Sequence, residues 1–252
     1  HGWHLERTVV GRKDTAVSKL VWLEVDGGGA RLFAAGLHGE ISEVCLQTLR
    51  SKWVVDSYGG AVWDLAVDVG EQKLYAACDD GSLRVFDCGN RQLSYEKMLS
   101  GRTPKRLLTV CLQGDIVYSA GEEGIIRSWT KKSGEPLPNT IRVETMGGAA
   151  AGKTTIVWSL KVLSDHTLIS GDSLGHTQVW DGRTGGLLAS FSQHTADVVA
   201  LAVNSQENIV FASGNDHKVV MIRLIGKDDT AGRPGVWKYS YAHRAHTHDV
   251  RA

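Results

Sequence analysis

The chain has 252 residues, and its 28 basic and 28 acidic side chains give a formal net charge of zero. This balance excludes a protein that coats nucleic acid or an anionic membrane by bulk electrostatics. The 29 glycines and four prolines, with 42% hydrophobic residues, favour a chain of many short strands and turns over a helical one.

The cysteines and the N-terminal residues indicate an intracellular protein. Cys45, Cys78, Cys88 and Cys111 show no CxxC spacing, and four cysteines are too few for a disulfide-stapled secreted domain of this length. We therefore expect buried, reduced thiols. Neither an apolar run long enough to span a membrane nor a secretory signal is seen, since residues 1–7 are polar and aromatic.

One local pattern recurs five times along the chain. Small residues and a glycine precede a polar or acidic pair, a turn residue and an alternating strand that ends in a bulky residue. The copies lie at residues 34–46, 76–87, 119–130, 169–181 and 212–224. Aligned on the turn residues Gly39, Gly81, Gly124, Gly175 and Lys218, they are 42, 43, 51 and 43 residues apart. A period of about 40–45 residues is that of WD40 repeats, each of which builds one four-stranded propeller blade.

The second copy shows how such a blade arises. An apolar inner strand at 62–67 is followed by strands at 73–78 and 82–87 and by an outer strand at 92–99. Gly81 suits the tight turn because glycine reaches positive φ without a Cβ clash. The sequence thus predicts an all-β, WD40-type β-propeller domain over residues 1–252. Its five full blades are expected near residues 17–57, 61–100, 105–146, 155–193 and 197–242.

The two ends of the chain resemble parts of further blades. Residues 3–10 are expected to form an outer strand, and residues 248–251 the start of an inner strand. Five full and two partial blades cannot close a ring without leaving exposed strand edges. We therefore expect missing sequence on both sides, and a chain that is part of a seven-bladed ring.

Six segments, matched in order along nearly the whole chain, resemble the cirhin family. They lie at residues 33–43, 61–67, 79–86, 156–162, 167–181 and 247–251. The resemblance implies a nuclear, nucleolar protein of the small-subunit processome, within its early UtpA (t-Utp) subcomplex. It further implies a scaffold for 18S rRNA maturation, without an active site, that binds other WD40 proteins of the subcomplex and the 5′ external transcribed spacer of pre-ribosomal RNA. The alternative is a WD40 module of another complex, such as a ubiquitin-ligase receptor or a chromatin reader.

The chain departs from the general WD40 pattern in most blades. Trp180-Asp181 is the one literal WD dipeptide at the end of a repeat, and the Gly-His element is missing before most blades. The hydrogen-bonded His, Ser and Asp core of ideal repeats is therefore expected in a single blade, through His194, Ser213 and Asp216.

Two motifs suggest a nucleotide site and a metal site, but the residues around them do not support either. Residues 147–154 match the phosphate-binding pattern GxxxxGK[ST], but the segment after them alternates as a strand does, whereas a P-loop leads into a helix. Nucleotide binding there is a remote alternative. His243, His246 and His248 lack the partner ligands of a zinc site. We expect no catalytic, cofactor, metal or small-molecule site, and no membrane contact.

Tryptophans recur in the predicted inner strands. Trp22, Trp63 and Trp158 each lie within an apolar stretch, and this placement favours packing between blades.

Basic residues gather in the loops expected to join the blades. They are the candidate contacts to protein and RNA: Arg12, Lys13, Arg102, Lys105, Arg106 and Lys153. Turns with Asp79, Asp80, Glu122 and Glu123 are expected on the same face. A face of mixed charge suits specific contacts with proteins and a few RNA phosphates.

Overall fold

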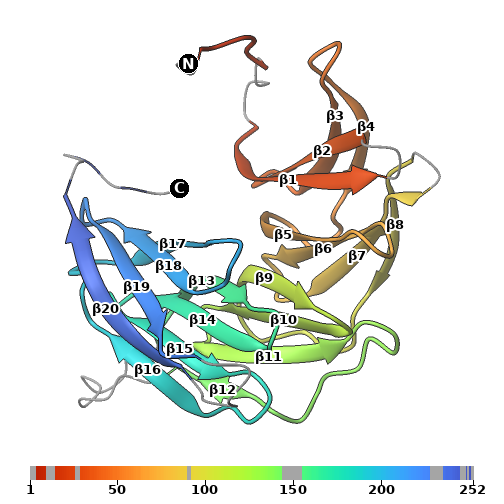
Figure 1. The fold of residues 1–252 in the computed structure, drawn as a ribbon. Coiled ribbons are helices and arrows are strands. Elements are labelled where there is room, and N and C mark those ends of the chain that lie inside the picture. Colours follow the sequence, from red (N-terminus) through yellow and green to blue (C-terminus); the bar gives the residue numbers. More distant parts are fainter. Residues whose placement is uncertain are drawn as a thin grey trace. The chain divides into compact units, whose positions relative to one another are not determined.

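The computed structural model describes residues 4–9, 15–25, 29–89, 92–143, 155–227, 235–244, 248 and 250. The chain forms two compact units, residues 1–110 and 111–252. In the described ranges, 20 strands build five four-stranded sheets, labelled in Figure 1. These ranges contain no helix with the length and apolar character needed to cross a membrane.

The first unit contains two complete sheets. The first has the order β1 (Val17–Val25), β2 (Gly29–Gly36), β3 (Glu40–Cys45) and β4 (Arg50–Asp56). The second has the order β5 (Val62–Asp68), β6 (Lys73–Cys78), β7 (Leu83–Asp87) and β8 (Ser94–Met98). Strand β9 (Leu107–Gln113) begins in this unit and ends in the next.

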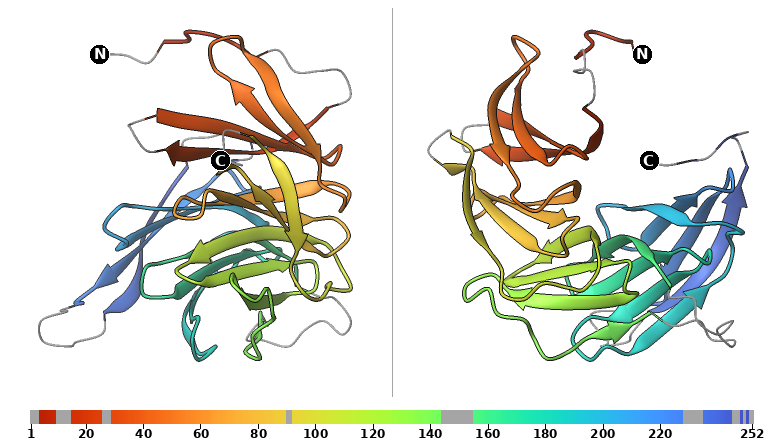
Figure 2. Two further views of the ribbon diagram at one scale, coloured as in Figure 1. Left: turned by 90° about the vertical axis from the view of Figure 1, so that its right-hand side faces the viewer. Right: turned by 180° about the vertical axis from the view of Figure 1, so that it is seen from behind.

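The second unit holds the remaining strands, and Figure 2 shows them from two further sides. One sheet has the order β12 (Ile141–Arg142), β11 (Ile125–Thr130), β10 (Ile116–Gly121) and β9. The next consists of β13 (Val157–Val162), β14 (Thr167–Asp172), β15 (Thr177–Asp181) and β16 (Leu187–Phe191). The last consists of β17 (Val198–Val203), β18 (Ile209–Gly214), β19 (Val219–Ile225) and β20 (Val236–His243). Four strands in sequence order per repeat confirm the predicted WD40 β-propeller fold, while a single domain over the whole chain stays a prediction.

Each sheet packs on its neighbour within the unit through alternate side chains of its strands. In the first unit, Leu23, Phe33 and Ile41 share one core with Leu74 and Phe86 of the second sheet. Two further cores in the second unit join β9–β12 to β13–β16, and β13–β16 to β17–β20. Since successive side chains of a strand point to opposite faces, a sheet between two others is apolar on both faces.

A buried ion pair strengthens the packing of the first two sheets. The Arg31 guanidinium donates to both carboxylate oxygens of Glu43, at 3.2 and 2.6 Å, and also to the backbone oxygen of Cys88. Arg31 lies on β2 and Cys88 follows β7. The ion pair lies within the first sheet, in a geometry that matches the planar guanidinium, and the hydrogen bond to Cys88 joins this sheet to the second.

The inner strands share a local irregularity that changes the roles of the tryptophans. The pairing register shifts between the first and third residues of β1, β5, β13 and β17, as at a β-bulge. Trp63 and Trp158 occupy the shifted position and are half-buried. Trp22 lies beyond the shift in β1 and is 54% exposed. The prediction of three equivalent core tryptophans is therefore wrong.

Two further expectations are corrected by the structure. Residues 4–9 are not in a strand, although an outer strand was predicted at 3–10. Cys45 is half-buried, whereas Cys78, Cys88 and Cys111 are buried as predicted, and all four are free thiols.

The turn of the fifth repeat is shifted by one residue from the predicted position. His217 adopts the positive φ of 63°, and Lys218 follows it. A histidine in the left-handed region is less common than a glycine there, which is why the sequence pattern pointed to the wrong residue.

Candidate functional site

His194 and Asp216 meet at the turn between β18 and β19. Nδ1 of His194 lies 2.8 Å from Oδ1 of Asp216, and both side chains are buried. The second carboxylate oxygen accepts the backbone N–H of Thr195 at 2.9 Å. The loop before β17 is thereby tied to the turn of the same sheet.

The third residue predicted for this network is placed differently. Ser213 is a buried residue of β18, but Nε2 of His194 has no hydrogen-bond partner among the described residues. Lys218 joins instead: its Nζ lies 3.3 Å from Oδ2 of Asp216 and donates to the backbone oxygen of Gln193 at 3.0 Å. No sequence signal marked Lys218 as a member, since its position is usually that of an exposed turn residue.

Burial by itself raises the pKa of Asp216, but its partners more than compensate. Hydrogen bonds from His194 and Thr195, with the Lys218 ammonium, lower the pKa to about 2. The carboxylate is therefore charged at every physiological pH. The network is a structural clamp that ties the loop before β17 to the β18–β19 turn.

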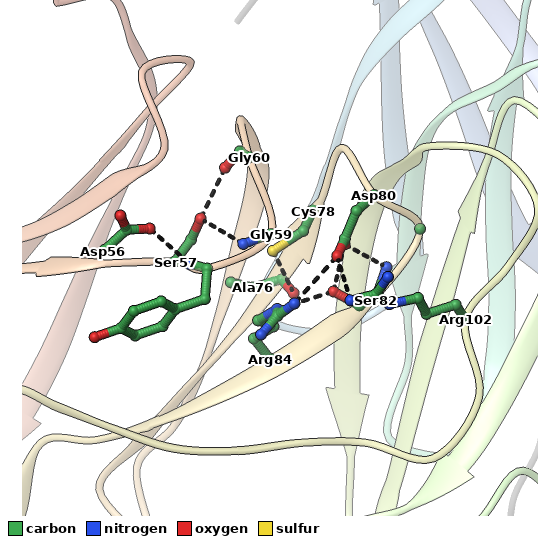
Figure 3. Close-up of polar contacts among 12 residues, drawn as sticks. Asp56, Ser57, Gly59, Gly60, Ala76, Cys78, Asp80, Ser82, Arg84 and Arg102 are labelled. Atoms are coloured by element: carbon green, nitrogen blue, oxygen red, sulfur yellow. Dashed lines mark hydrogen bonds and ion pairs between the residues drawn. The ribbon is translucent and has the colours of Figure 1, made fainter.

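A second polar cluster lies in the first unit, where the β6–β7 turn contacts the loop between β8 and β9. Nη2 of Arg102 lies 3.1 Å from Oδ2 of Asp80, and Nε of Arg106 lies 3.0 Å from Oδ1 of Asp79. Figure 3 shows Asp80 between Arg102 on one side and the β4–β5 loop on the other. The basic loop and the acidic turn predicted to share one face are thus in direct contact.

Asp80 also has partners within its own sheet. Its carboxylate accepts hydrogen bonds from the Ser82 hydroxyl and, at 3.1 Å, from Nη2 of Arg84, whose side chain is buried. Burial alone would raise the pKa of Asp80, but the bonds from Ser82 and Arg84 outweigh it and lower the pKa. Asp80 thus holds one buried and one exposed guanidinium.

The predicted basic contact residues divide into two groups. Arg102, Lys105 and Arg106 lie on one exposed loop, and the first and third are anchored by carboxylates. The other three lie outside the described residues: Arg12, Lys13 and Lys153. All six residues therefore remain candidate contacts, and the structure describes three of them.

Trp63 belongs to the same cluster. Its indole N–H donates to Oδ1 of Asp79 at 3.1 Å, and the Arg106 guanidinium lies 5.9 Å from the centre of its ring. Asp79 therefore connects an inner-strand tryptophan to the basic loop. This arrangement of an aromatic ring, a guanidinium and a carboxylate is one that recognition surfaces often use.

Sequence reasoning missed the loop between β4 and β5. Tyr58 is 62% exposed and has a positive φ of 58°. Its backbone N–H donates to Oδ1 of Asp56 at 2.6 Å, and Gly59 allows close contact because a Cβ there would lie 2.7 Å from Cβ of Cys78. The one available signal was the segment Ser57-Tyr58-Gly59-Gly60, which places a large aromatic residue beside two glycines.

The remaining candidate motifs gain no support as reactive sites. The GxxxxGKT loop at 147–154 lies outside the described residues, but the strand predicted after it is confirmed as β13. Of the three clustered histidines, His246 lies outside the described part. Within the described ranges, no group of three or more His, Cys, Asp or Glu side chains is placed to hold a metal ion.

Comparison with known proteins identifies the relatives of this chain. The family model "WD domain, G-beta repeat" matches residues 44–87 and 185–222. U3 small nucleolar RNA-associated protein 4 homolog of Homo sapiens is 32% identical over 247 residues, which cover 98% of this chain. This chain is therefore similar, over nearly its whole length, to U3 small nucleolar RNA-associated protein 4, also called cirhin. The mouse homolog is 31% identical over 248 residues, again 98% of the chain, and the Schizosaccharomyces pombe protein is 31% identical over 255 residues, or 99% of it.

The chain spans about a third of the length of these relatives. It covers 35% of the human and mouse proteins and 34% of the Schizosaccharomyces pombe protein. The similarity to these relatives confirms the predicted resemblance to the cirhin family. Membership of the UtpA subcomplex remains a prediction.

Proposed function

We propose that this chain is part of a non-catalytic scaffold in ribosome biogenesis that works in the nucleolus as a component of the small-subunit processome. The observation that carries the proposal is the likeness over nearly the whole chain to proteins named for their association with U3 small nucleolar RNA. A fold of WD40 sheets with loops on stiff strands supports it, because such loops lose little conformational entropy on binding.

The partners in this proposal are other WD40 proteins of the UtpA subcomplex and the 5′ external transcribed spacer of pre-ribosomal RNA. The loop with Arg102, Lys105 and Arg106 is our candidate for local contacts with RNA phosphates or protein carboxylates. Because Asp79 and Asp80 offset part of its charge, such contacts are few and specific rather than an extended RNA wrap.

Affinity purification of the tagged full-length protein tests this function. The expected result is recovery of spacer-containing pre-ribosomal RNA and other WD40 proteins in a particle that resists moderate salt. Depletion of the protein should lower the yield of 18S rRNA, because a scaffold acts before the cleavages that release it.

Two results would count against the scaffold role. Recovery of neither the spacer RNA nor the WD40 partners rejects it. Recovery of ubiquitin-ligase or chromatin components in their place would assign the chain to another WD40 complex.

A further inference from the structure

Tyr58 is held at the surface by a loop built for that conformation. Two side-chain oxygens fix the loop: Oδ1 of Asp56 accepts the Tyr58 N–H, and Oγ of Ser57 accepts the Gly59 N–H at 3.2 Å. Oγ of Ser57 also donates to the backbone oxygen of Gly60 at 2.7 Å. A non-glycine residue with positive φ persists only where its surroundings enforce it, and such residues gather at functional sites.

The ring of Tyr58 keeps an open face. Its one aromatic neighbour among the described residues is Tyr95 of β8, with ring centres 5.2 Å apart and planes at 69°. A T-shaped contact of this kind covers at most one face of each ring. Since Tyr58 is 62% exposed, a planar group in solution can stack on it.

The backbone after Tyr58 lies close to an ion-paired cluster that reaches the basic loop. Gly59 packs so closely that a Cβ on it would lie 3.0 Å from Nε of Arg84. The Arg84 guanidinium binds Asp80, which also binds Arg102. Gly59, the residue after Tyr58, and Arg102 thus lie on either side of one ion-paired cluster, as Figure 3 shows.

The basic loop can bind an anion through Arg102. The three exposed cations Arg102, Lys105 and Arg106 lie near three carboxylates, Asp56, Asp79 and Asp80, whereas Arg84 is buried. Arg102 is 56% exposed and contacts Asp80 through a single nitrogen, Nη2. Because a guanidinium carries five N–H donors, the others can bind a phosphate while the ion pair persists.

We infer that this strip binds unpaired RNA, with a base stacked on Tyr58 and a neighbouring phosphate on Arg102. An exposed aromatic ring beside cations is how proteins bind single strands with little sequence preference, since every base has a flat face. Paired bases do not offer that face, so the strip selects single-stranded segments. This inference rests on the proposed association with RNA and specifies which groups of the RNA the strip contacts.

Fluorescence anisotropy with the full-length protein tests the inference. The probes are labelled oligoadenylate and oligouridylate of about 12 nucleotides, within the usual site size, and a hairpin of similar length. Tyr58→Asn removes the ring but tolerates positive φ, and Tyr58→Phe retains the ring. Arg102→Ala removes one cation, while Arg84 still pairs with Asp80.

The two sites are expected to respond differently. Tyr58→Asn should weaken single-strand binding about tenfold without altering its salt dependence, and Tyr58→Phe should bind as the unmodified protein does. Arg102→Ala should reduce the slope of log affinity against log salt by about 0.7, the value for one phosphate on a single strand. Matched controls are Tyr241→Thr, which removes another exposed tyrosine, and Lys132→Ala, which removes an exposed cation paired with Asp115.

Three outcomes overturn the inference. Binding that neither Tyr58→Asn nor Arg102→Ala alters would place the RNA elsewhere and leave the proposed scaffold function intact. A lost protein partner in the purified particle, with unchanged RNA affinity, would make this strip a protein contact. Failure of the unmodified protein to bind either oligonucleotide rejects the inference too, whereas recovery of the particle decides the scaffold role separately.

Discussion

At the scale of single residues, Asp216 is the side chain with the most partners in its turn. Its carboxylate accepts from the imidazole of His194 and the N–H of Thr195, and lies beside the Lys218 ammonium. All these interactions favour the ionised form, so a buried carboxylate is kept charged. Removing the charge leaves donors unsatisfied, and the buried lysine without a counter-ion.

Asp216→Asn should lower the free energy of unfolding by about 2 kcal/mol at neutral pH, as expected from its lowered pKa. Because the pKa is lower in the folded state than in the unfolded one, this contribution is complete above about pH 5. It is lost as the pH falls toward 2. Urea unfolding followed by tryptophan fluorescence at several pH values measures the difference from the unmodified protein.

A carboxylate in an exposed ion pair is the control for this prediction. Asp115 lies 3.1 Å from Nζ of Lys132, and both side chains are largely exposed. Asp115→Asn should change the unfolding free energy by less than about 0.5 kcal/mol. An Asp216→Asn variant that loses no more than this control would contradict the clamp.

The members of these residue-scale clusters were only partly predictable. His194 and Asp216 follow from the repeat pattern, because their spacing recurs in ideal WD40 units. Lys218 also depends on the backbone oxygen of Gln193 in another loop, and Tyr58 contacts the ring of Tyr95 in β8, and no local pattern encodes those neighbours. Ser213 was predicted from a pattern whose hydrogen bond this chain does not form among the described residues.

At the scale of elements, the β6–β7 turn packs closely on the loop between β8 and β9. Gly81 has a φ of 77°, and a Cβ there would lie 2.3 Å from the backbone oxygen of Thr103 and 2.7 Å from that of Lys105. The hydroxyl of Thr103 donates to the backbone oxygen of Lys105 at 2.5 Å and lies 3.2 Å from that of Gly81. Glycine is therefore required by the neighbouring loop as well as by the turn.

Gly81→Ala should destabilise the fold by about 2–4 kcal/mol, since the clash involves backbone atoms and adds to the cost of positive φ. Gly101→Ala measures the cost of positive φ alone. Gly101 has a φ of 81° and open space around its Cβ position, so this variant should cost about 1 kcal/mol. Thermal unfolding of both variants measures the difference, and equal losses would show that the packing against Thr103 and Lys105 contributes nothing.

The register shifts in the inner strands explain why tryptophans in similar sequence contexts differ in burial. A β-bulge moves every later side chain by one position relative to the partner strand. Trp63 lies at the shift and reaches Asp79, whereas Trp22 lies four residues after the corresponding shift in β1 and faces solvent. Apolar alternation predicts the strand but not the site of the shift.

At the scale of the whole molecule, the cysteines are distributed between protected and accessible positions. Burial raises the pKa of Cys78 and of Cys88 to about 12. Hydrogen bonds from Thr48 lower the pKa of Cys45, which is half-buried. Because the thiolate is the reactive form, the order of reaction with an alkylating reagent follows from these environments.

Cys45 should react with iodoacetamide at pH 8 at least about a hundredfold faster than Cys78 or Cys88, since a thiol of pKa about 12 is almost wholly protonated there. Mass spectrometry of the separate peptides, sampled over time, measures the rates. Concentrated guanidinium chloride should make these rates similar. Native labelling of Cys78 as fast as Cys45 would contradict the buried environment.

The sequence by itself determined the strands of the five sheets, though not the absence of one at residues 4–9, together with the repeat period and the sheet order. Side-chain alternation and turn residues act within a few positions of the chain. It also determined which residue types crowd the loops. Only the tertiary structure decided which of those residues meet: Arg102 with Asp80, Trp63 with Asp79, and Lys218 with Asp216. These contacts join side chains from different loops or turns, or depend on a shift of one residue, so packing rather than local pattern sets them.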